Sequence, residues 1–156
     1  MKTKKPAPEK KYFTVAEANA TLPLARAIVK DITTLARDLR ERHERLKRLE
    51  PNEGAKLGQA YQEEVEQVRT EFERDQERMR DFLKELNDLG IQLKDFDTGL
   101  LDFPCLLDGR EVYLCWKQGE PEVTHWHEID AGFKGRREIT PDFGRRQRAE
   151  SSGVSN

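Results

Sequence analysis

Two histidines stand two positions apart in the stretch EVTHWHEIDAGFKGRRE, which covers residues 122–138. Residues i and i+2 of a β-strand point to the same face of a sheet, so His125 and His127 can reach one metal ion there. Carboxylates would complete the set of ligands, and the candidates are Glu17, Glu128 and Asp130. The stretch predicts either a divalent-metal site or a strand whose histidines are satisfied by ordinary hydrogen bonds.

The same stretch ends in a basic segment, DAGFKGRR, that contains two glycines. Exposed backbone amides combined with basic side chains can hold an anion. The basic side chains concerned are Lys134, Arg136 and Arg137. The alternative interpretation is a turn that leads the chain out of a sheet.

No known catalytic motif accompanies these residues. The sequence contains no phosphate-binding loop, no dinucleotide-binding glycine motif, no GxSxG element and no HExxH motif. A hydrolytic reaction with His127 as general acid–base, oriented by Glu128 or Asp130, is chemically feasible. Neither a nucleophile nor a substrate can be named, so the sequence leaves open whether the protein is an enzyme.

Long amphipathic helices precede this stretch and must position it, and the first begins near residue 14. Thr14 and Glu17 have the three-residue spacing of a capping box. Thr21 followed by Pro23 predicts a second helix start directly afterwards. The expected result is a short helix and then a long one.

Two apolar stripes indicate a pair of long helices. Apolar residues recur every three, four or seven positions from residue 25 to residue 49, and again from 57 to 86. Glycine and proline in the segment 50–58 interrupt the pattern, and Gly90 is placed as a C-terminal cap. Because the two stripes match along their length, we predict an antiparallel helical hairpin over residues 14–89.

The period of the apolar pattern changes to two after Gly90, which is typical of β-strands. Asp108-Gly109 stands between two β-rich runs and is a strong signal for a two-residue hairpin. The runs IQLKDF and VTHWHEI add a strand on either side. We therefore predict three or four antiparallel strands over residues 91–130. The fold class is α+β: a long antiparallel helical hairpin followed by a small antiparallel sheet.

The Asp108-Gly109 turn also sets the pairing of the two strands that it joins. Cys105 should lie opposite Val112 and point to the same face, whereas Cys115 has the opposite parity. The two cysteines are therefore expected to be free thiols on opposite faces of the sheet. Their spacing does not fit a zinc ribbon.

The direction of the histidines depends on the loop before them. A loop of even length over residues 118–121 places His125 and His127 on the face that the helices cover, and it buries two β-branched residues as well. A loop of odd length places Trp126 on that face instead. We expect the even loop, with Glu17 from the N-terminal helix as the partner of a buried His127.

Composition and charge limit the class of protein. The 156 residues suffice for one domain, and 35% hydrophobic against 37% charged residues is typical of long exposed helices. Nine acidic and three basic residues give segment 91–130 a net charge of −6, which repels nucleic-acid backbones, so we expect no specific nucleic-acid binding. The basic ends, residues 1–11 and 141–156, are predicted to be disordered tails around one domain at 12–140.

Two absences from the sequence indicate where the protein acts. No apolar run is long enough to span a membrane, and the N-terminus lacks the apolar region of a secretory signal. Two cysteines without such a signal are typical of a reducing compartment, so we expect a cytoplasmic protein.

Four motifs of the C-terminal half are hard to obtain together by chance: LLDFP, GREVYLCW, GEPEV and WHEIDAGFKGR. Together with YFTVAEANATLPLARAIV they resemble the bacterial domain-of-unknown-function family 2203, over roughly residues 12–139. The resemblance implies a small bacterial cytosolic protein and no particular activity. In the family pattern a Trp-His-Glu sequence matches Trp126, His127 and Glu128, whereas His125 departs from it. The resemblance therefore favours a polar cluster over a two-histidine metal site, and its members would be His127, Glu128, Asp130 and Arg136.

Two functions compete on these grounds. The first is a non-enzymatic interaction module whose helical hairpin self-associates as a dimer, because strands of five or six residues cover only about half of such helices. The second is a metal- or anion-binding domain, with hydrolysis as one option, whose site lies between the sheet and the proximal ends of the helices. We favour the first.

Overall fold

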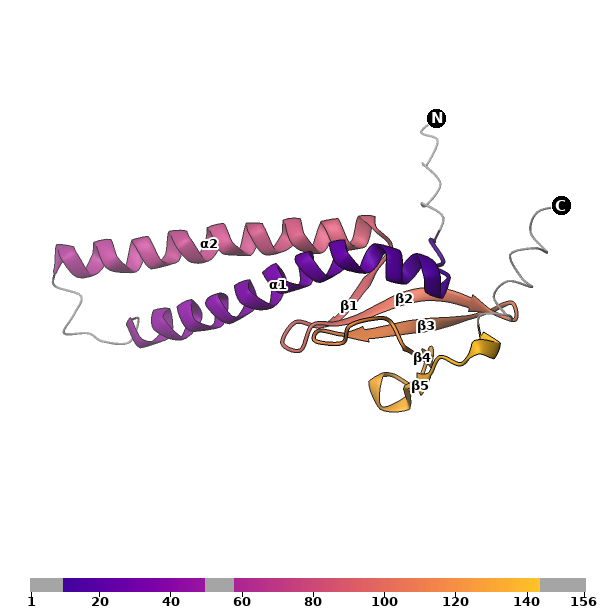
Figure 1. Ribbon diagram of the computed structural model, residues 1–156. Helices are drawn as coiled ribbons and strands as arrows, with labels where there is room; N and C mark the ends of the chain where they lie inside the picture. Colours follow the sequence, from indigo (N-terminus) through magenta and orange to yellow (C-terminus); the bar gives the residue numbers. More distant parts are fainter. Residues whose placement is uncertain (1–9, 50–57, 144–156) are drawn as a thin grey trace, which may run out of the picture.

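The computed structural model describes residues 10–49 and 58–143, and Figure 1 shows how its elements are arranged. The helices are α1 (Val15–Leu49) and α2 (Gln59–Asp88). The strands are β1 (Gln92–Asp95), β2 (Leu100–Leu107), β3 (Arg110–Lys117), β4 (His125–Glu128) and β5 (Arg137–Glu138), with the short 3-10 helix η2 (Phe133–Gly135) before the last. The predicted α+β fold with a helical hairpin is therefore confirmed.

α1 is one continuous helix, so the predicted second start near Pro23 is wrong. The capping box does begin it: the Thr14 hydroxyl accepts the Glu17 backbone N–H, and the Glu17 carboxylate accepts the Thr14 N–H. Pro23 lies inside the helix, where its missing N–H costs about 3 kcal/mol. The helix persists because Leu22 and Ala25, on either side of the proline, are buried in the core, and burying Leu22 alone contributes about 1.5–3 kcal/mol.

α2 runs back along α1 and ends in a glycine cap (Figure 1). Gly90 has a φ of +86°, its N–H donates to the carbonyl of Asn87, and the N–H of Ile91 donates to the carbonyl of Leu86. These two hydrogen bonds form a Schellman motif, which ends the helix and turns the chain toward β1. The predicted cap at Gly90 is confirmed.

Only the proximal part of the hairpin lies against the sheet (Figure 1). The buried residues of α1 extend from Ala18 to Leu35, and no residue of that helix beyond Leu35 is buried. Farther out, the two helices hold each other through an ion pair between Arg42 and the buried Asp75. Arg40, a little beyond Leu35, still contacts the turn after β1 through an ion pair of 2.6 Å with Asp97. Beyond that contact, the described distal part of the hairpin is a two-helix structure.

The five strands form one antiparallel sheet in the order β1-β2-β3-β4-β5. The Asp108-Gly109 turn joins β2 to β3, and both residues have the positive φ, 51° and 78°, that a two-residue type I′ hairpin requires. Cys105 pairs with Val112 as predicted. The sheet has one strand more than predicted, because the chain returns after η2 to pair with β4.

One face of the sheet packs against the helices and the other faces away from them. Phe103, Leu114 and Trp126 are successive partners across the strands and belong to the buried core with residues of α1. His125 and His127 alternate with Trp126, so both point to the face opposite the helices. The expected even loop is therefore wrong, and so is the expected position of the histidines under the helices.

The segment before β4 explains this outcome. Val123 is buried, but its N–H donates to the side chain of Asn19 in α1, at 2.7 Å, and not to the sheet. Arg26 of α1 donates to the carbonyl of Pro121 at 2.9 Å. The chain leaves strand geometry between residues 118 and 124, so the alternation of faces is not carried across that segment.

The described structure continues past the sheet to Phe143, which is buried against Trp126 with the ring centroids 5.4 Å apart. The prediction of disordered tails rests mainly on residues 1–9 and 144–156, which lie outside the described residues. The predicted turn at 50–57 lies outside them as well. No helix within the described ranges is long and apolar enough to cross a membrane.

Candidate functional site

The face of the sheet that points away from the helices carries a row of polar side chains. Gln92, Asp102, Cys115 and His125 are successive partners across β1 to β4. Directly opposed residues of antiparallel strands share a face, so these side chains gather on one surface together with His127. Although neither α1 nor α2 lies on this surface, Asp102, Cys115 and His127 are buried.

His127 is the centre of the buried cluster. Its Nε2 lies 2.9 Å from Oδ1 of Asp102, and its Nδ1 lies 2.7 Å from the backbone carbonyl oxygen of Glu128. A carbonyl oxygen only accepts hydrogen bonds, so Nδ1 carries a proton and donates it there. Nε2 is therefore the ring nitrogen that faces the Asp102 carboxylate.

Cys115 is the third member of the buried cluster. Its Sγ, a carboxylate oxygen of Asp102 and a ring nitrogen of His127 all lie within 4.8 Å of one another. Burial and, secondarily, the negative charge of Asp102 raise the pKa of the thiol to about 12. The thiol therefore stays protonated at neutral pH and lacks the thiolate character that a nucleophilic cysteine needs.

Arg136 and Glu120 close the buried cluster on the side of β5. The Arg136 guanidinium donates to Oε1 of Glu120 at 2.6 Å and to the backbone carbonyl of Cys115 at 3.3 Å. The same carboxylate oxygen accepts the backbone N–H of Lys117 at 2.6 Å, and the Glu120 carbonyl accepts the indole N–H of Trp116. These contacts tie the loop after β3 and the segment after η2 to the sheet beside Cys115.

His125, the other histidine predicted as a metal ligand, lies next to the cluster without joining it. It is the register partner of Cys115. Its Nδ1 forms a hydrogen bond of 2.9 Å with the Thr124 hydroxyl and lies 3.8 Å from Oε2 of Glu120. His125 is also less buried than His127.

The carboxylates predicted as metal ligands lie elsewhere. The Glu128 side chain points to the opposite face and forms an ion pair of 2.8 Å with an arginine of β3. Asp130 is exposed beyond the end of β4. Glu17 caps α1 on the helix side of the sheet, so the predicted pair of Glu17 and His127 is wrong. The partner of His127 is Asp102.

The three basic residues predicted as an anion site do not converge. Arg137 is the register partner of Trp126 on the helix side, and its guanidinium lies 5.3 Å from the centroid of that ring. Arg136 has the opposite parity, and its charge is paired with Glu120. Lys134 is exposed on η2.

Asp102 and Cys115 are site residues that the sequence patterns did not single out, although a signal was present. The Asp108-Gly109 turn, whose register was predicted, places Asp102 directly opposite Cys115. The pattern could not predict that His127 joins them, because the irregular loop before β4 decides to which face of the sheet its side chain points.

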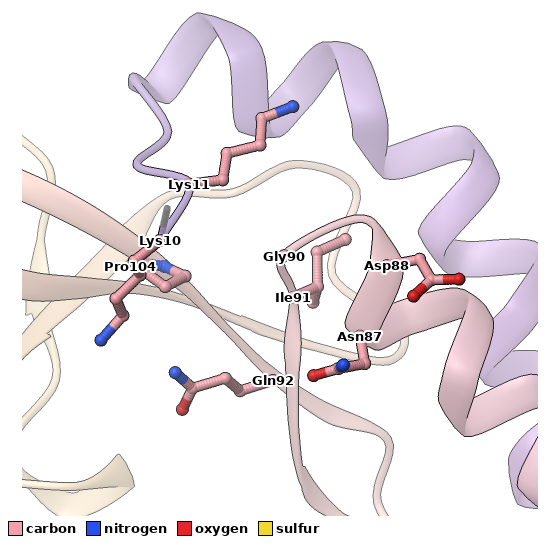
Figure 2. A pocket seen from close by; sticks show the side chains of 8 residues that line it. All are labelled: Lys10, Lys11, Asn87, Asp88, Gly90, Ile91, Gln92 and Pro104. Carbon is pink, nitrogen blue, oxygen red and sulfur yellow. The ribbon is translucent and has the colours of Figure 1, made fainter. Parts of the chain in front are cut away.

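A pocket of about 380 Å³ adjoins this surface at the β1 edge (Figure 2). Gln92, which lines the pocket, is the register partner of Asp102 in the buried cluster. The lining comes from the segment before α1, the end of α2 and the strands β1 and β2, and consists of Lys10, Lys11, Asn87, Asp88, Gly90, Ile91, Gln92 and Pro104.

Much of the charge in the pocket is already paired. Lys10 forms an ion pair with Glu111, and Asp88 forms one of 2.8 Å with Lys84. The pocket therefore offers a ligand amide groups and little net charge.

Each of the four sequence motifs supplies a residue of the buried cluster or of the ion pair beside it. LLDFP supplies Asp102, GREVYLCW supplies Cys115 and GEPEV supplies Glu120. WHEIDAGFKGR supplies both His127 and Arg136. Motifs that are spread over 37 positions of the chain thus meet at one place on the sheet, through the contacts described above.

Comparison with known proteins agrees with these motifs. A family model described as an uncharacterized conserved protein (DUF2203) matches residues 11–139. No curated protein and no solved structure matches the chain. Because the matched segment includes most of the chain and all four motifs, the protein belongs to the DUF2203 family.

Proposed function

We propose that this protein is an interaction module whose helical hairpin self-associates into a two-fold dimer. The sheet steadies the proximal half of the hairpin, and the distal half is the surface for the second copy. The observation that carries the proposal is the difference in burial between these two halves.

The helices are much longer than the sheet that covers them. α1 has 35 residues and α2 has 30, which correspond to about 52 Å and 45 Å at a rise of about 1.5 Å per residue. The longest strands have 8 residues, or about 27 Å. The sheet therefore leaves the distal stretch of the hairpin uncovered.

This distal stretch has an apolar stripe that two helices alone do not bury. Its partly exposed residues are Leu39, Leu46, Leu49, Tyr61, Val65 and Phe72. Leu39 also lines a shallow hollow of about 500 Å³ between the helices, with Gln76, Met79 and Arg80. A second hairpin would cover the stripe and the hollow in a four-helix arrangement with coiled-coil-like packing, gaining on the order of 1 kcal/mol for each half-buried side chain.

The two helices carry opposite charge in the distal stretch. Residues 39–49 contain five basic and two acidic residues, a net charge of +3, and residues 59–72 contain four acidic residues and one basic residue, a net charge of −3. In a two-fold dimer that sets α1 beside the partner's α2, opposite charges meet twice. A dimer that sets like helices side by side would instead be opposed by repulsion.

Sedimentation equilibrium at micromolar concentration tests this arrangement, and we expect a dimer. Glu63→Lys with Glu66→Lys on α2 should give a monomer, and so should Lys47→Glu with Arg48→Glu on α1, because like charges then face each other twice. An equimolar mixture of the two variants should dimerise again, since each α1 meets an α2 of opposite charge. All four side chains are exposed, so the changes leave the hairpin itself intact.

A matched control reverses two exposed charges on the proximal part of α2, Glu77→Lys with Asp81→Lys, and should remain dimeric. The proposal fails if the native protein is a monomer with full helical content throughout the concentration range. It also fails if mixing the two reversed variants does not restore association.

Two further parts of the proposal concern location and partners. We place the protein in the cytoplasm, which the two buried cysteines, Cys105 and Cys115, support because they form no disulfide with each other. We propose no specific nucleic-acid partner, because segment 91–130 carries a net charge of −6.

A further inference from the structure

We propose that Asp102, Cys115 and His127 bind one transition-metal ion of the Zn²⁺ class. The three residues come from the neighbouring strands β2, β3 and β4, so the register of the sheet sets their spacing. The cluster lies on the face away from the helices and takes no part in the proposed dimer. The two proposals therefore stand or fall separately.

The distances suit a tetrahedral site. One ligand atom from each residue lies within 4.8 Å of the other two, and Oδ1 of Asp102 and Nε2 of His127 are 2.9 Å apart. Ligand bonds of about 2.0–2.3 Å to Zn²⁺ place the ligand atoms of a tetrahedron about 3.3–3.7 Å from one another. The ligand atoms would have to move by about 1 Å to take up that geometry.

The orientation of His127 is the one that a metal ligand needs. Its Nδ1–H donates to the backbone carbonyl of Glu128 at 2.7 Å, which leaves Nε2 directed at Asp102 and Cys115. Ligating histidines almost always donate their other ring N–H to a carbonyl or a carboxylate in this way, and the hydrogen bond fixes the tautomer.

The donor atoms select the class of ion. Sulfur and imidazole nitrogen bind Zn²⁺, Co²⁺ and related ions, whereas Mg²⁺ and Ca²⁺ prefer a shell of oxygen atoms. Three protein ligands leave one tetrahedral position for water or another small ligand.

Charge balance favours a divalent ion at this buried position. Cys115 binds a metal as a thiolate, and its proton goes to solvent. The thiolate and the Asp102 carboxylate then carry two negative charges, which balance the two positive charges of the ion. This matters because a net charge at such a buried position would cost several kcal/mol.

The weak edge of the sheet provides a route for the ion. β5 pairs with β4 through two residues only, and the Arg136–Glu120 ion pair beside the cluster is partly exposed. Local opening of such an edge requires far less free energy than global unfolding.

Cobalt titration of the full-length, untagged protein, first stripped with a chelator, tests the proposal. We expect saturation at one Co²⁺ per chain, with visible d–d absorption of a tetrahedral site and a thiolate-to-cobalt charge-transfer band. At least one proton should be released per ion, as measured in weakly buffered solution, because Cys115 binds as a thiolate. Added Zn²⁺ should displace the cobalt and abolish both bands.

Two matched cysteine variants locate the ligand. Cys115→Ala should lose the charge-transfer band and bind more than about 100-fold more weakly, because loss of outer partners alone costs about 10–100-fold. Cys105→Ala should keep the band, since Cys105 is equally buried but points to the helix side. His125→Gln should keep it too, whereas His127→Gln should weaken binding with Cys115 still present.

Failure of the native protein, folded by circular dichroism, to bind one equivalent of Co²⁺ would overturn the proposal without reference to any variant. So would a charge-transfer band that survives Cys115→Ala and disappears in Cys105→Ala. Either result would leave the dimer proposal untouched.

Discussion

At the scale of single residues, the buried carboxylate of Asp102 needs hydrogen bonds to stabilise it whenever the protein carries no metal. A buried carboxylate costs several kcal/mol unless hydrogen bonds replace its water. Asp102 receives them from Nε2 of His127 and from the Cys115 thiol. The three residues therefore also form a hydrogen-bond network that links β2, β3 and β4, and a stability measurement will detect it.

We expect Asp102→Ala to lower the free energy of unfolding by about 3–5 kcal/mol, because His127 loses the partner of Nε2 in a buried position. Urea denaturation measures the loss. In a double-mutant cycle with His127→Ala, the two changes should couple by more than about 1 kcal/mol. Additive effects would mean that the two side chains do not interact in solution.

A pH effect on stability should come from Cys115. Its pKa is raised from 9.0 to about 12 in the folded state, so between these values the native state holds a proton that the unfolded state has lost. Its contribution is therefore fully present below about pH 9 and is lost as the pH rises toward 12, with a slope of at most about 1.4 kcal/mol per pH unit. Cys115→Ala should lose stability less steeply than the native protein between pH 9 and 11. Parallel curves would contradict the shift.

At the scale of elements, the turn between β1 and β2 docks the sheet onto α1. Asp95 shapes the turn by accepting the N–H of Asp97 and the hydroxyl of Thr98, and these hydrogen bonds lower its pKa. Gly99 closes the turn with a φ of +68°, and a Cβ built there would lie 2.8 Å from Cγ1 of the buried Val29 in α1. Only glycine meets both requirements, the left-handed backbone and the close approach to the helix.

Gly99→Ala should therefore destabilise the fold twice over, by about 1–2 kcal/mol for the left-handed backbone and a further 1–3 kcal/mol for overpacking against Val29. Gly119 provides the control, because its φ is also positive, at +106°, and nothing lies within 4 Å of its Cβ position. Gly119→Ala should show the backbone cost alone. The free energy of unfolding is measured by thermal or urea unfolding. Equal decreases in the two variants would show that the close approach of residue 99 to α1 adds nothing to the cost of the substitution.

At the scale of the whole molecule, the sheet covers only part of the length of the helical hairpin. Helices and sheet form two layers around one core over residues 18–35 of α1. Residues 36–49 contain no buried residue, although Ala36 and Leu39 still pack against the core and Arg40 pairs with Asp97 in the turn after β1. Backbone hydrogen bonds open more readily where fewer apolar contacts hold them. Stability should therefore decrease along α1 from the sheet toward the tip.

Hydrogen exchange measures this gradient directly. In dilute solution, amides of residues 36–49 should exchange faster than those of residues 18–35. If the hairpin pairs with a second copy, protection of the distal amides should rise with protein concentration by mass action, while the proximal amides stay constant. Equal amide protection in residues 18–35 and 36–49 at every protein concentration would contradict both proposals: that the sheet stabilises the proximal half of α1, and that the distal half pairs with a second copy.

The sequence by itself determined those features that local rules control. The capping box at Thr14, the glycine cap at Gly90 and the type I′ turn at Asp108-Gly109 each depend on a few adjacent residues, and all three are present. The turn also determined the β2–β3 register, which places Asp102 opposite Cys115 and keeps Cys105 on the other face. The α+β class and the helical hairpin followed from the two periods of the apolar pattern.

Only the tertiary structure decided which way His127 points. Parity along a strand cannot be counted through a loop that leaves strand geometry, and Asn19 and Arg26 of α1 hold residues 121–123 out of the sheet. The same docking places Trp126 in the core and turns His127 to the other face, where Asp102 satisfies it. Continuity of α1 through Pro23 was decided in the same way, because burial against the sheet outweighs one lost hydrogen bond. In each case side-chain contacts between residues far apart in the chain overrode the local pattern.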